Sequence, residues 1–399
     1  MRNTLKTIEF IRNNSNWEEL FSQKPYCITV SRDAMFGRNL VLLKYNQMDS
    51  DFHNEIVREC RGLILDEDTF EPVCVPFFKF GNYGESYCPE IDWKNCWVGQ
   101  KLDGSLIKIV RLGEDLLIST NGTIDAFKAN LQEQIGCDSK NFGELVVEAI
   151  VDAFYDRIDW DGFGLPLCQE TVKKECIEFF KSNLEDNKTY MFELTSPFNK
   201  VVVQWHETRL NFLGVRDNTT LQETYFNDHF LKDLFNTPKV FPLRTIDECV
   251  KAAQELGDDE EGFVVCDRDF NRVKVKSPTY VSLHHIKNNN ILSYERGIEI
   301  VRGNELDEVL TYFPEFKPHL EKIRDDCEEL KKKLNVANES MNEIRKMETR
   351  KEQALTIQRI FGRHSGVGFA LLDGKIKDVD KWFMNCPSAN LVKILGYKD

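Results

Sequence analysis

The sequence predicts an α+β protein with mainly antiparallel sheets, followed by an all-helical C-terminal domain. Strand-like runs between residues 25 and 285 are short and irregularly spaced, without the regular strand–helix alternation of a doubly wound parallel sheet. Residues 319–361 contain neither proline nor glycine and are rich in Glu, Lys, Leu, Arg and Met, which indicates long helices. We therefore expect a mixed domain over residues 1–285 and a helical domain over residues 286–399.

The expected strands follow one another along the first domain as runs of β-branched, aromatic and aliphatic residues bounded by turn signals. They are YCITVS, RGLILD, SLIKIV, LLIST, YMFELT, KVVVQW, LNFLGV, EGFVVCD and RVKVKS. Helical patterns over residues 126–134 and 170–184 lie between them. In the second domain, the asparagines at residues 335–338 favour a break in the long helical stretch.

Composition limits the classes of protein that this chain can belong to. Its 399 residues carry 52 Lys and Arg against 66 Asp and Glu, a formal net charge of −14, which excludes a general nucleic-acid coat but allows a local polyanion site. No two of the 12 cysteines lie within three residues of each other, which argues against zinc ribbons. The N-terminal residues read as an amphipathic helix, and no run is long and apolar enough for a membrane span. We expect a cytoplasmic protein, in the host cytoplasm if it is viral, with no membrane partner.

The stretch GQKLDGSLIKI places Lys101 two residues before Asp103 and Gly104. Asp-Gly between two apolar runs is a strong hairpin signal, so the stretch can be an ordinary turn with a solvated lysine. It can also present the lysine as a nucleophile. The sequence KLDG alone does not separate these two interpretations.

Six further residues carry charges where a strand pattern does not require them. In RVKVKS, Lys274 and Lys276 point to the same face of a strand, which is either a solvated face or a paired grip on phosphate. Glu193 in YMFELT and Glu261 in EEGFVV stand beside apolar runs, as structural ion pairs or as ligands. ECRGLILD and PFFKFGNYGE add two basic residues in unusual surroundings, Arg61 and Lys79.

Taken in order, these motifs resemble the covalent nucleotidyltransferases, which comprise DNA ligases, RNA ligases and mRNA capping enzymes. ECRGLILD and FFKFGNYGE around KLDGS are similar to the type 1 branch of ATP-dependent RNA ligases, the phage T4 kind. The resemblance covers roughly residues 50–285. It departs from the family at Ser119, Thr120 and Asn121, where such ligases often carry a basic residue.

The resemblance implies an ATP-dependent ligase that joins RNA 5′-phosphate and 3′-hydroxyl ends through lysyl-AMP and RNA-adenylate intermediates. Lys101 would be the nucleophile, its pKa lowered from about 10.4 by desolvation and by Lys274, Lys276 and Mg²⁺ or Mn²⁺. Glu261 would hold the metal, directly or through water, and Glu193 would hold the ribose or the waters of the metal. Residues assigned to ATP binding are Arg61, Lys79, Asp103 (as a brace for the turn), Gly104 (as room for the nucleotide), Glu193, Glu261, Lys274 and Lys276.

The helical domain has a local basic surplus between residues 345 and 363. Lys346 and Arg350, like Arg359 and Arg363, are spaced i, i+4 and would share a helix face. This surplus is a solvated helix or an RNA contact through Arg345, Lys346, Arg350 and Lys351, with broken tRNA as one suggested substrate. Three alternatives stay open: a DNA ligase, a capping-type nucleotidyltransferase, and a non-catalytic protein that binds nucleotides or RNA ends. The helical character of residues 286–399 counts against the first two, which normally append a β-barrel.

Overall fold

A computed structural model describes residues 4–131, 136–158, 168–199, 202–257, 260–285, 292–376 and 378–397. The chain divides into two compact units, Met1–Tyr280 and Val281–Asp399. The first holds three antiparallel sheets and the second is helical in its described residues, so the predicted fold class is confirmed. The assignment of functional domains to residues 1–285 and 286–399 stays a prediction.

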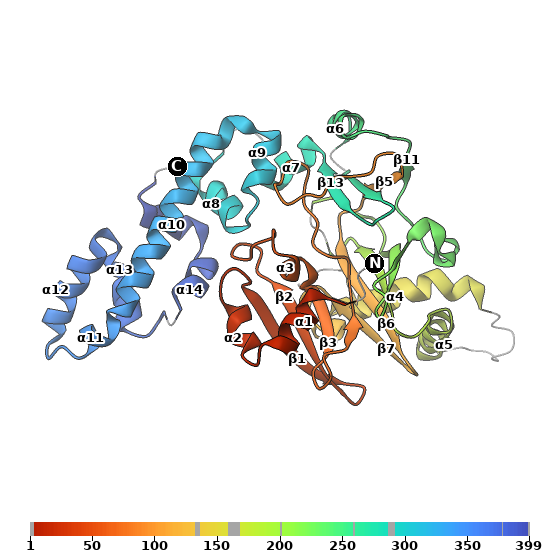
Figure 1. Ribbon diagram of the computed structural model, residues 1–399, viewed down its shortest axis with the longest axis horizontal. Helices are drawn as coiled ribbons and strands as arrows, with labels where there is room; N and C mark the ends of the chain where they lie inside the picture. Colours follow the sequence, from red (N-terminus) through yellow and green to blue (C-terminus); the bar gives the residue numbers. More distant parts are fainter. Residues whose placement is uncertain are drawn as a thin grey trace. The chain divides into compact units, whose positions relative to one another are not determined.

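The first sheet packs against other elements on both faces of its two inner strands. Its order is β1 (Ile28–Met35), β2 (Arg38–Tyr45), β3 (Arg61–Asp66) and β4 (Pro72–Cys74). Because side chains alternate along a strand, Val41 and Leu63 pack under α1 (Lys6–Asn13) and α2 (Trp17–Ser22), whereas Leu42 and Ile64 pack against the second sheet. The helix α3 (Glu55–Glu59) leads directly into β3, and Figure 1 shows α1–α3 beside β1–β3.

The second sheet forms the centre of this unit. Its order is β10 (Glu223–Tyr225), β9 (Arg209–Asp217), β8 (Lys188–Thr195), β6 (Ser105–Leu112) and β7 (Asp115–Thr120). Two helices, α4 (Phe142–Phe154) and α5 (Gln169–Ser182), cover one face and bury an aromatic core around Phe180, Phe192 and Phe212. The predicted helix over 170–184 thus corresponds to α5.

The third sheet carries the charged motifs. Its order is β11 (Val240–Phe241), β5 (Cys96–Lys101), β12 (Gly262–Asp267) and β13 (Arg272–Lys276), and α6 (Ile246–Gln254) packs on it. In the register of these strands Gly262 is opposite Lys101 on one side and Lys276 on the other. Lys101 and Lys276, far apart in the sequence, therefore lie on either side of one strand, β12.

Three β-hairpins turn through the same local design, which begins with an aspartate at the end of a strand. The Oδ1 atoms of Asp66, Asp217 and Asp267 each accept hydrogen bonds from two backbone amides in the turn. Each turn also contains a bulky residue with a positive φ, namely Phe70 (56°), Leu221 (60°) and Phe270 (61°). Bulky side chains seldom adopt this conformation, so the aspartate bonds hold the backbone there.

Two local predictions for the first unit are wrong. The helix expected over residues 126–134 is a single 3₁₀ turn, η1 (Ala126–Lys128), in its described part. The run KVVVQW contributes no strand in its described residues, because the amides of Val202 and Val203 donate to Asp103 instead of to a neighbouring strand.

The boundary between the two units falls within α7 (Pro278–His285), and the second unit begins at Val281. It is built from α8 (Tyr294–Arg302), α9 (Leu306–Tyr312), α10 (Lys317–Glu339), α11 (Met341–Arg345), α12 (Arg350–Phe361), α13 (Ser365–Leu372), α14 (Val379–Asn385) and α15 (Ser388–Leu395). The helix α10 runs through residues 335–338 and ends at Glu339, so the predicted break lies a few residues further on. Of the described helices, none has the length and apolar character that crossing a membrane requires.

The shared hairpin design predicts a measurable cost of removing one aspartate. Asp66→Ala removes three hydrogen bonds, from the amides of Asp68 and Thr69 and from the Thr69 hydroxyl. We expect it to lower the free energy of unfolding of the first unit by about 1–2 kcal/mol, measured by urea titration. The neighbouring exposed change Asp68→Ala serves as the control and should stay within about 0.5 kcal/mol of the wild type. Equal effects of the two changes would contradict this account.

Candidate active site

Three neighbouring strands bring Lys101, Glu261 and Lys276 together. Lys101 Nζ lies 2.5 Å from Glu261 Oε2, and Lys276 Nζ lies 3.7 Å from Glu261 Oε1. The Glu261 side chain is only 4% exposed, so two lysines compensate one buried carboxylate. The pairing depends on Gly262, whose φ is +141° and whose Cβ would come within 2.2 Å of the Val275 carbonyl oxygen.

The KLDG turn does not close a hairpin. It connects β5 of the third sheet to β6 of the second, so the hairpin interpretation is wrong. The buried Asp103 braces this crossing, because its carboxylate accepts hydrogen bonds from the amides of Val202 and Val203 and from the Tyr280 hydroxyl. Gly104 is required by a close approach: its Cβ would lie 2.4 Å from the Leu194 carbonyl oxygen.

A cavity of about 260 Å³ opens beside this turn. Of the sequence-predicted residues, Arg61, Lys101, Gly104, Glu193 and Lys274 line it, together with the aromatic side chains of Phe77, Phe80, Tyr225 and Phe226. Two other predicted residues, Glu261 and Lys276, contact or flank Lys101 without lining the cavity. Lys79 lines a neighbouring groove, where its ammonium lies 4.8 Å from the centre of the Phe52 ring.

The cavity concentrates positive charge. Burial holds the pKa of Lys274 well below its ordinary value, and the charges of Lys79, Lys276, Lys101 and Arg61 lower it further. The described acidic side chains make no ion pair with Lys274, and its ammonium lies 5.1 Å from the centre of the Phe80 ring. The mutual repulsion of Lys274 and these four cationic side chains is unfavourable unless a bound anion offsets it.

Two polar atoms in the cavity wall are buried and have no hydrogen-bond partner among the described residues. They are Arg61 Nη1 and Asn121 Oδ1. Buried polar atoms are satisfied in the large majority of cases, so an unpartnered donor and an unpartnered acceptor in one cavity indicate a ligand with both kinds of group. Nucleotides are such ligands.

Glu193 differs from Glu261 in its electrostatics. It lies on β8 in the cavity wall, where burial raises its pKa to about 7; the charge of Lys101 opposes the rise and that of Glu261 adds to it. Near neutral pH the side chain is therefore present in both its protonated and its carboxylate form, and a cation in the cavity would favour the carboxylate.

Sequence reasoning missed Lys108, which is fully buried on β6. Its ammonium donates to the Gly62 carbonyl oxygen, and burial lowers its pKa to about 8. Lys108 is opposite Ser119 in the β6–β7 pair. It therefore places a cation beside residues 119–121, where the ligases that the sequence resembles often carry a basic residue. A lysine inside the apolar run SLIKIV was the available signal.

In the second unit, the structure separates the basic residues that were expected to share a helix face. Lys346 follows the end of α11 and Arg350 begins α12, whereas Arg363 belongs to η7 (Gly362–His364), so both i, i+4 pairings are wrong. Arg345 donates to the Leu371 carbonyl oxygen, and Arg350 pairs with Asp373 at 2.5 Å. Lys346 and Lys351 are exposed.

The model of a T4-type protein family, described as RNA ligase, matches residues 59–280, which are more than half of the chain. The chain therefore belongs to this RNA ligase family. The matched range contains every predicted active-site residue, from Arg61 to Lys276.

Two relatives found by sequence agree with this assignment. A candidate bifunctional polynucleotide kinase/RNA ligase of Autographa californica nuclear polyhedrosis virus is 30% identical over 293 residues, which are 70% of this chain and 38% of the viral protein. The RNA ligase of Rhodothermus phage RM378 is 26% identical over 344 residues, covering 68% and 70% of the two chains. A solved archaeal ATP-dependent RNA ligase aligns over 77% of this chain and 75% of its own with a TM-score of 0.41 and 15% identity.

The raised pKa of Glu193 predicts a pH dependence of stability. Because its folded-state pKa of about 7 exceeds the ordinary 4.5, the folded protein binds more protons than the unfolded chain between these values, and Glu193 destabilises the fold as pH rises through this window. Glu193→Gln removes the titration. We expect its melting temperature to rise relative to the wild type from pH 4.5 to about 7, measured by calorimetry. A constant difference between the two proteins would contradict the assignment.

Proposed function

We propose that this protein is an ATP-dependent RNA ligase that seals 5′-phosphate to 3′-hydroxyl ends through a lysyl-AMP intermediate. The observation that carries the proposal is the contact of Lys101 Nζ with the buried Glu261 carboxylate, at the edge of a cavity with several cations and aromatic walls. The arrangement combines a nucleophile, a proton acceptor and a phosphate site.

In the first step, Lys101 Nζ attacks the α-phosphorus of ATP. A P–N bond forms, the P–O bond to pyrophosphate breaks, and the nitrogen loses a proton. Glu261 Oε2, 2.5 Å from Nζ, is placed to accept this proton. The charges of Lys274 and Lys276 would stabilise the negative charge that develops on the phosphates.

The two glutamates fit a hard divalent cation. The described residues contain no group of three or more His, Cys, Asp or Glu side chains that could hold a metal by themselves, so phosphate oxygens and water would complete the ligand set. Glu261 and Glu193 would contribute carboxylate oxygens. When bound with ATP, Mg²⁺, or Mn²⁺ in its place, would neutralise phosphate charge and help pyrophosphate to leave.

The remaining predicted residues act on phosphates in this proposal. Arg61, with its unpartnered Nη1, would contact the ATP phosphates and later the RNA 5′-phosphate, and Lys79 would assist from the neighbouring groove. AMP then passes from Lys101 to the RNA 5′-phosphate. The 3′-hydroxyl attacks the resulting RNA-adenylate, a phosphodiester forms, and AMP leaves.

The helical unit would select the RNA, with broken tRNA as one suggested substrate. Arg345 and Arg350 already have partners within the unit, so Lys346 and Lys351 are the better candidates for phosphate contacts. Such contacts would be sequence-independent and salt-sensitive.

The proposal predicts a covalent adduct when the protein is incubated with α-labelled ATP and Mg²⁺. Lys101→Ala and Lys101→Arg should lower adduct formation by about a thousandfold or more, because neither side chain offers a neutral amine. The exposed change Lys94→Ala on the same unit is the control and should keep the wild-type yield. A wild-type yield from Lys101→Ala would remove this residue from the mechanism.

The same assay separates the alternatives. No adduct from the wild-type protein with any nucleotide would indicate a non-catalytic binding protein. An adduct formed with GTP in preference to ATP would indicate a capping-type enzyme, and sealing of DNA in preference to RNA ends would indicate a DNA ligase.

A second prediction concerns the helical unit. The double change Lys346→Ala/Lys351→Ala should leave adduct formation intact but weaken binding of a stem-loop RNA, and it should reduce the slope of log affinity against log salt by about two. Fluorescence anisotropy at several salt concentrations measures both quantities. Lys317→Ala/Lys332→Ala, on exposed positions of α10, is the matched control. An unchanged salt slope in the first variant would make residues 346–351 an ordinary solvated segment.

A further inference from the structure

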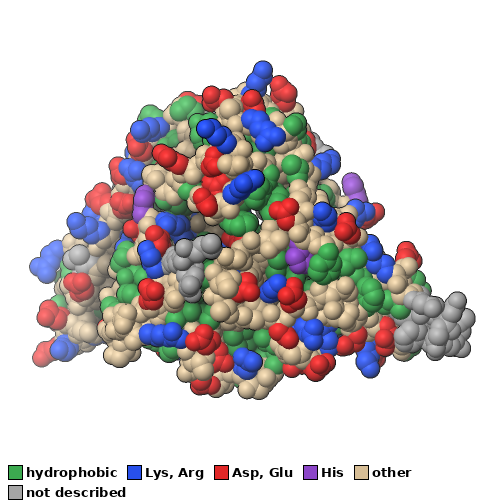
Figure 2. All heavy atoms as spheres, turned by 45° about the vertical axis from the view of Figure 1, so that its right-hand side comes forward, with side chains coloured by type: hydrophobic (Ala, Val, Ile, Leu, Met, Phe, Trp, Pro, Cys, Tyr) green, Lys and Arg blue, Asp and Glu red, His purple; other side chains and the backbone are tan. Residues whose placement is uncertain are grey.

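A second hollow, with a volume of about 700 Å³, lies beside the ATP cavity and shares Phe80 and Arg272 with it. We call it the Arg216 groove. Its lining contains two acidic residues, Glu223 and Asp269, and the cations Arg58, Lys79, Arg216, Arg268 and Arg272. Acidic and basic side chains are interspersed on the face that Figure 2 shows, and the chain as a whole is acidic, so this local excess of positive charge is unusual for the molecule.

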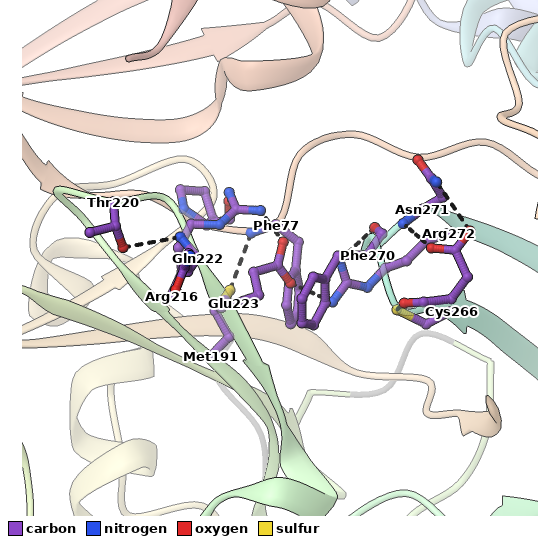
Figure 3. Close-up of polar contacts among 12 residues, drawn as sticks. Phe77, Met191, Arg216, Thr220, Gln222, Glu223, Cys266, Phe270, Asn271 and Arg272 are labelled. Carbon is purple, nitrogen blue, oxygen red and sulfur yellow. Dashed lines mark hydrogen bonds and ion pairs between the residues drawn. The ribbon is translucent and has the colours of Figure 1, made fainter. Parts of the chain in front are cut away.

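The base of the groove holds more positive than negative charge. Glu223 lies between Arg216 and Arg272 and pairs with both, its Oε2 lying 2.5 Å from Arg272 (Figure 3). The three side chains are 4%, 4% and 8% exposed, so one carboxylate faces two buried guanidinium groups. A buried charge without a counter-charge is costly, and an anion in the groove would reduce that cost.

Arg216 has unused hydrogen-bonding capacity. Its Nη1 donates to the Pro76 carbonyl oxygen at 2.5 Å, but its Nε is buried and has no partner among the described residues. The guanidinium lies 4.1 Å from the centre of the Phe78 ring, which fixes its plane. A guanidinium held in this way is suited to phosphate.

The walls of the groove add aromatic surface. Phe78, Phe80, Tyr87 and Phe270 line it. Two of the residues with positive φ, Leu221 and Phe270, also line it, in the hairpin turns after β9 and β12. A positively charged groove with aromatic side chains is typical of proteins that bind single-stranded nucleic acid.

We propose that the Arg216 groove binds the phosphodiester backbone of single-stranded RNA next to the end that reacts in the ATP cavity. This inference rests on the proposed function and assigns a place to its RNA substrate. The groove is much larger than a single phosphate ion requires, and the shared Phe80 and Arg272 place it directly next to the cavity that contains Lys101.

Two adjacent residues allow a test in opposite directions. Arg268 and Asp269 are both exposed in the turn after β12, and both line the groove. We expect Arg268→Glu to weaken, and Asp269→Asn to strengthen, the binding of a fluorescein-labelled single-stranded oligoribonucleotide, each by about threefold to tenfold at low salt. Arg268→Glu should also lower the salt slope by about one. Fluorescence anisotropy measures the affinity without requiring any chemistry.

The matched control is Arg244→Glu, the same charge reversal at an exposed position outside the groove. Its RNA affinity should stay within about twofold of the wild type. Unchanged affinity in both groove variants, a change in the same direction in both, or an equal loss in the control would overturn the proposal.

Adduct formation with α-labelled ATP distinguishes a failure of the RNA-groove proposal from a failure of the proposed ligase activity. The ATP concentration for half-maximal adduct should be the same in Arg268→Glu and the wild type; an increase would extend the ATP triphosphate beyond Lys79 as far as Arg268 and overturn the RNA assignment. If the wild type forms no adduct, the proposed ligase activity fails, whereas opposite shifts of RNA affinity in the two groove variants would still support an RNA site in the groove.

Discussion

The pairing of β12 with both β5 and β13 at Gly262 is the constraint on which the active site depends. Because Gly262 has no side chain, the backbone of Val275 approaches it closely, and Lys101 and Lys276 come to flank the residue before it, Glu261. The buried carboxylate needs these two cations, and the lysines need the carboxylate. The sheet therefore holds a charged centre in place before any substrate binds.

Positive charge is concentrated at two places in a chain that is acidic as a whole. Positive charge is gathered in the cavity around Lys274 and in the Arg216 groove, whereas the net charge of the whole protein is −14. Clefts lined by one sign of charge focus the field and attract oppositely charged ligands, even on a protein of the opposite net charge. Phosphates would thus be guided to these two places rather than to the general surface.

The sequence allowed prediction of many of the strands and of the charged positions, but not of every strand or of how the strands meet. Runs such as RGLILD and RVKVKS correspond to β3 and β13, since period-2 alternation reflects local burial. The KLDG turn resembles a hairpin locally, yet β5 and β6 belong to different sheets, a property that only tertiary packing determines. The breaks in the helical unit were misplaced because propensity changes little between residues 319 and 361.

Long-range contacts of charged side chains were the least predictable part of the site. Arg216 and Arg272 meet at Glu223 although Arg272 is 49 residues away, and Lys108 reaches Gly62 across 46 residues. Neither contact has a local sequence pattern. A charged residue inside an apolar strand does signal that a partner exists, but its identity depends on the order of strands in the sheets.

The hydrogen bond from Tyr280 to Asp103 determines how far along the chain the first unit must extend to keep the turn after Lys101 in place. Tyr280 lies four residues beyond the last strand residue, Lys276, and its hydroxyl donates at 2.9 Å to the carboxylate that braces the turn after Lys101. An N-terminal fragment cut directly after β13 would keep all three sheets but release this brace. The smallest fragment that preserves the nucleophile's setting therefore extends through Tyr280, into the first turn of α7.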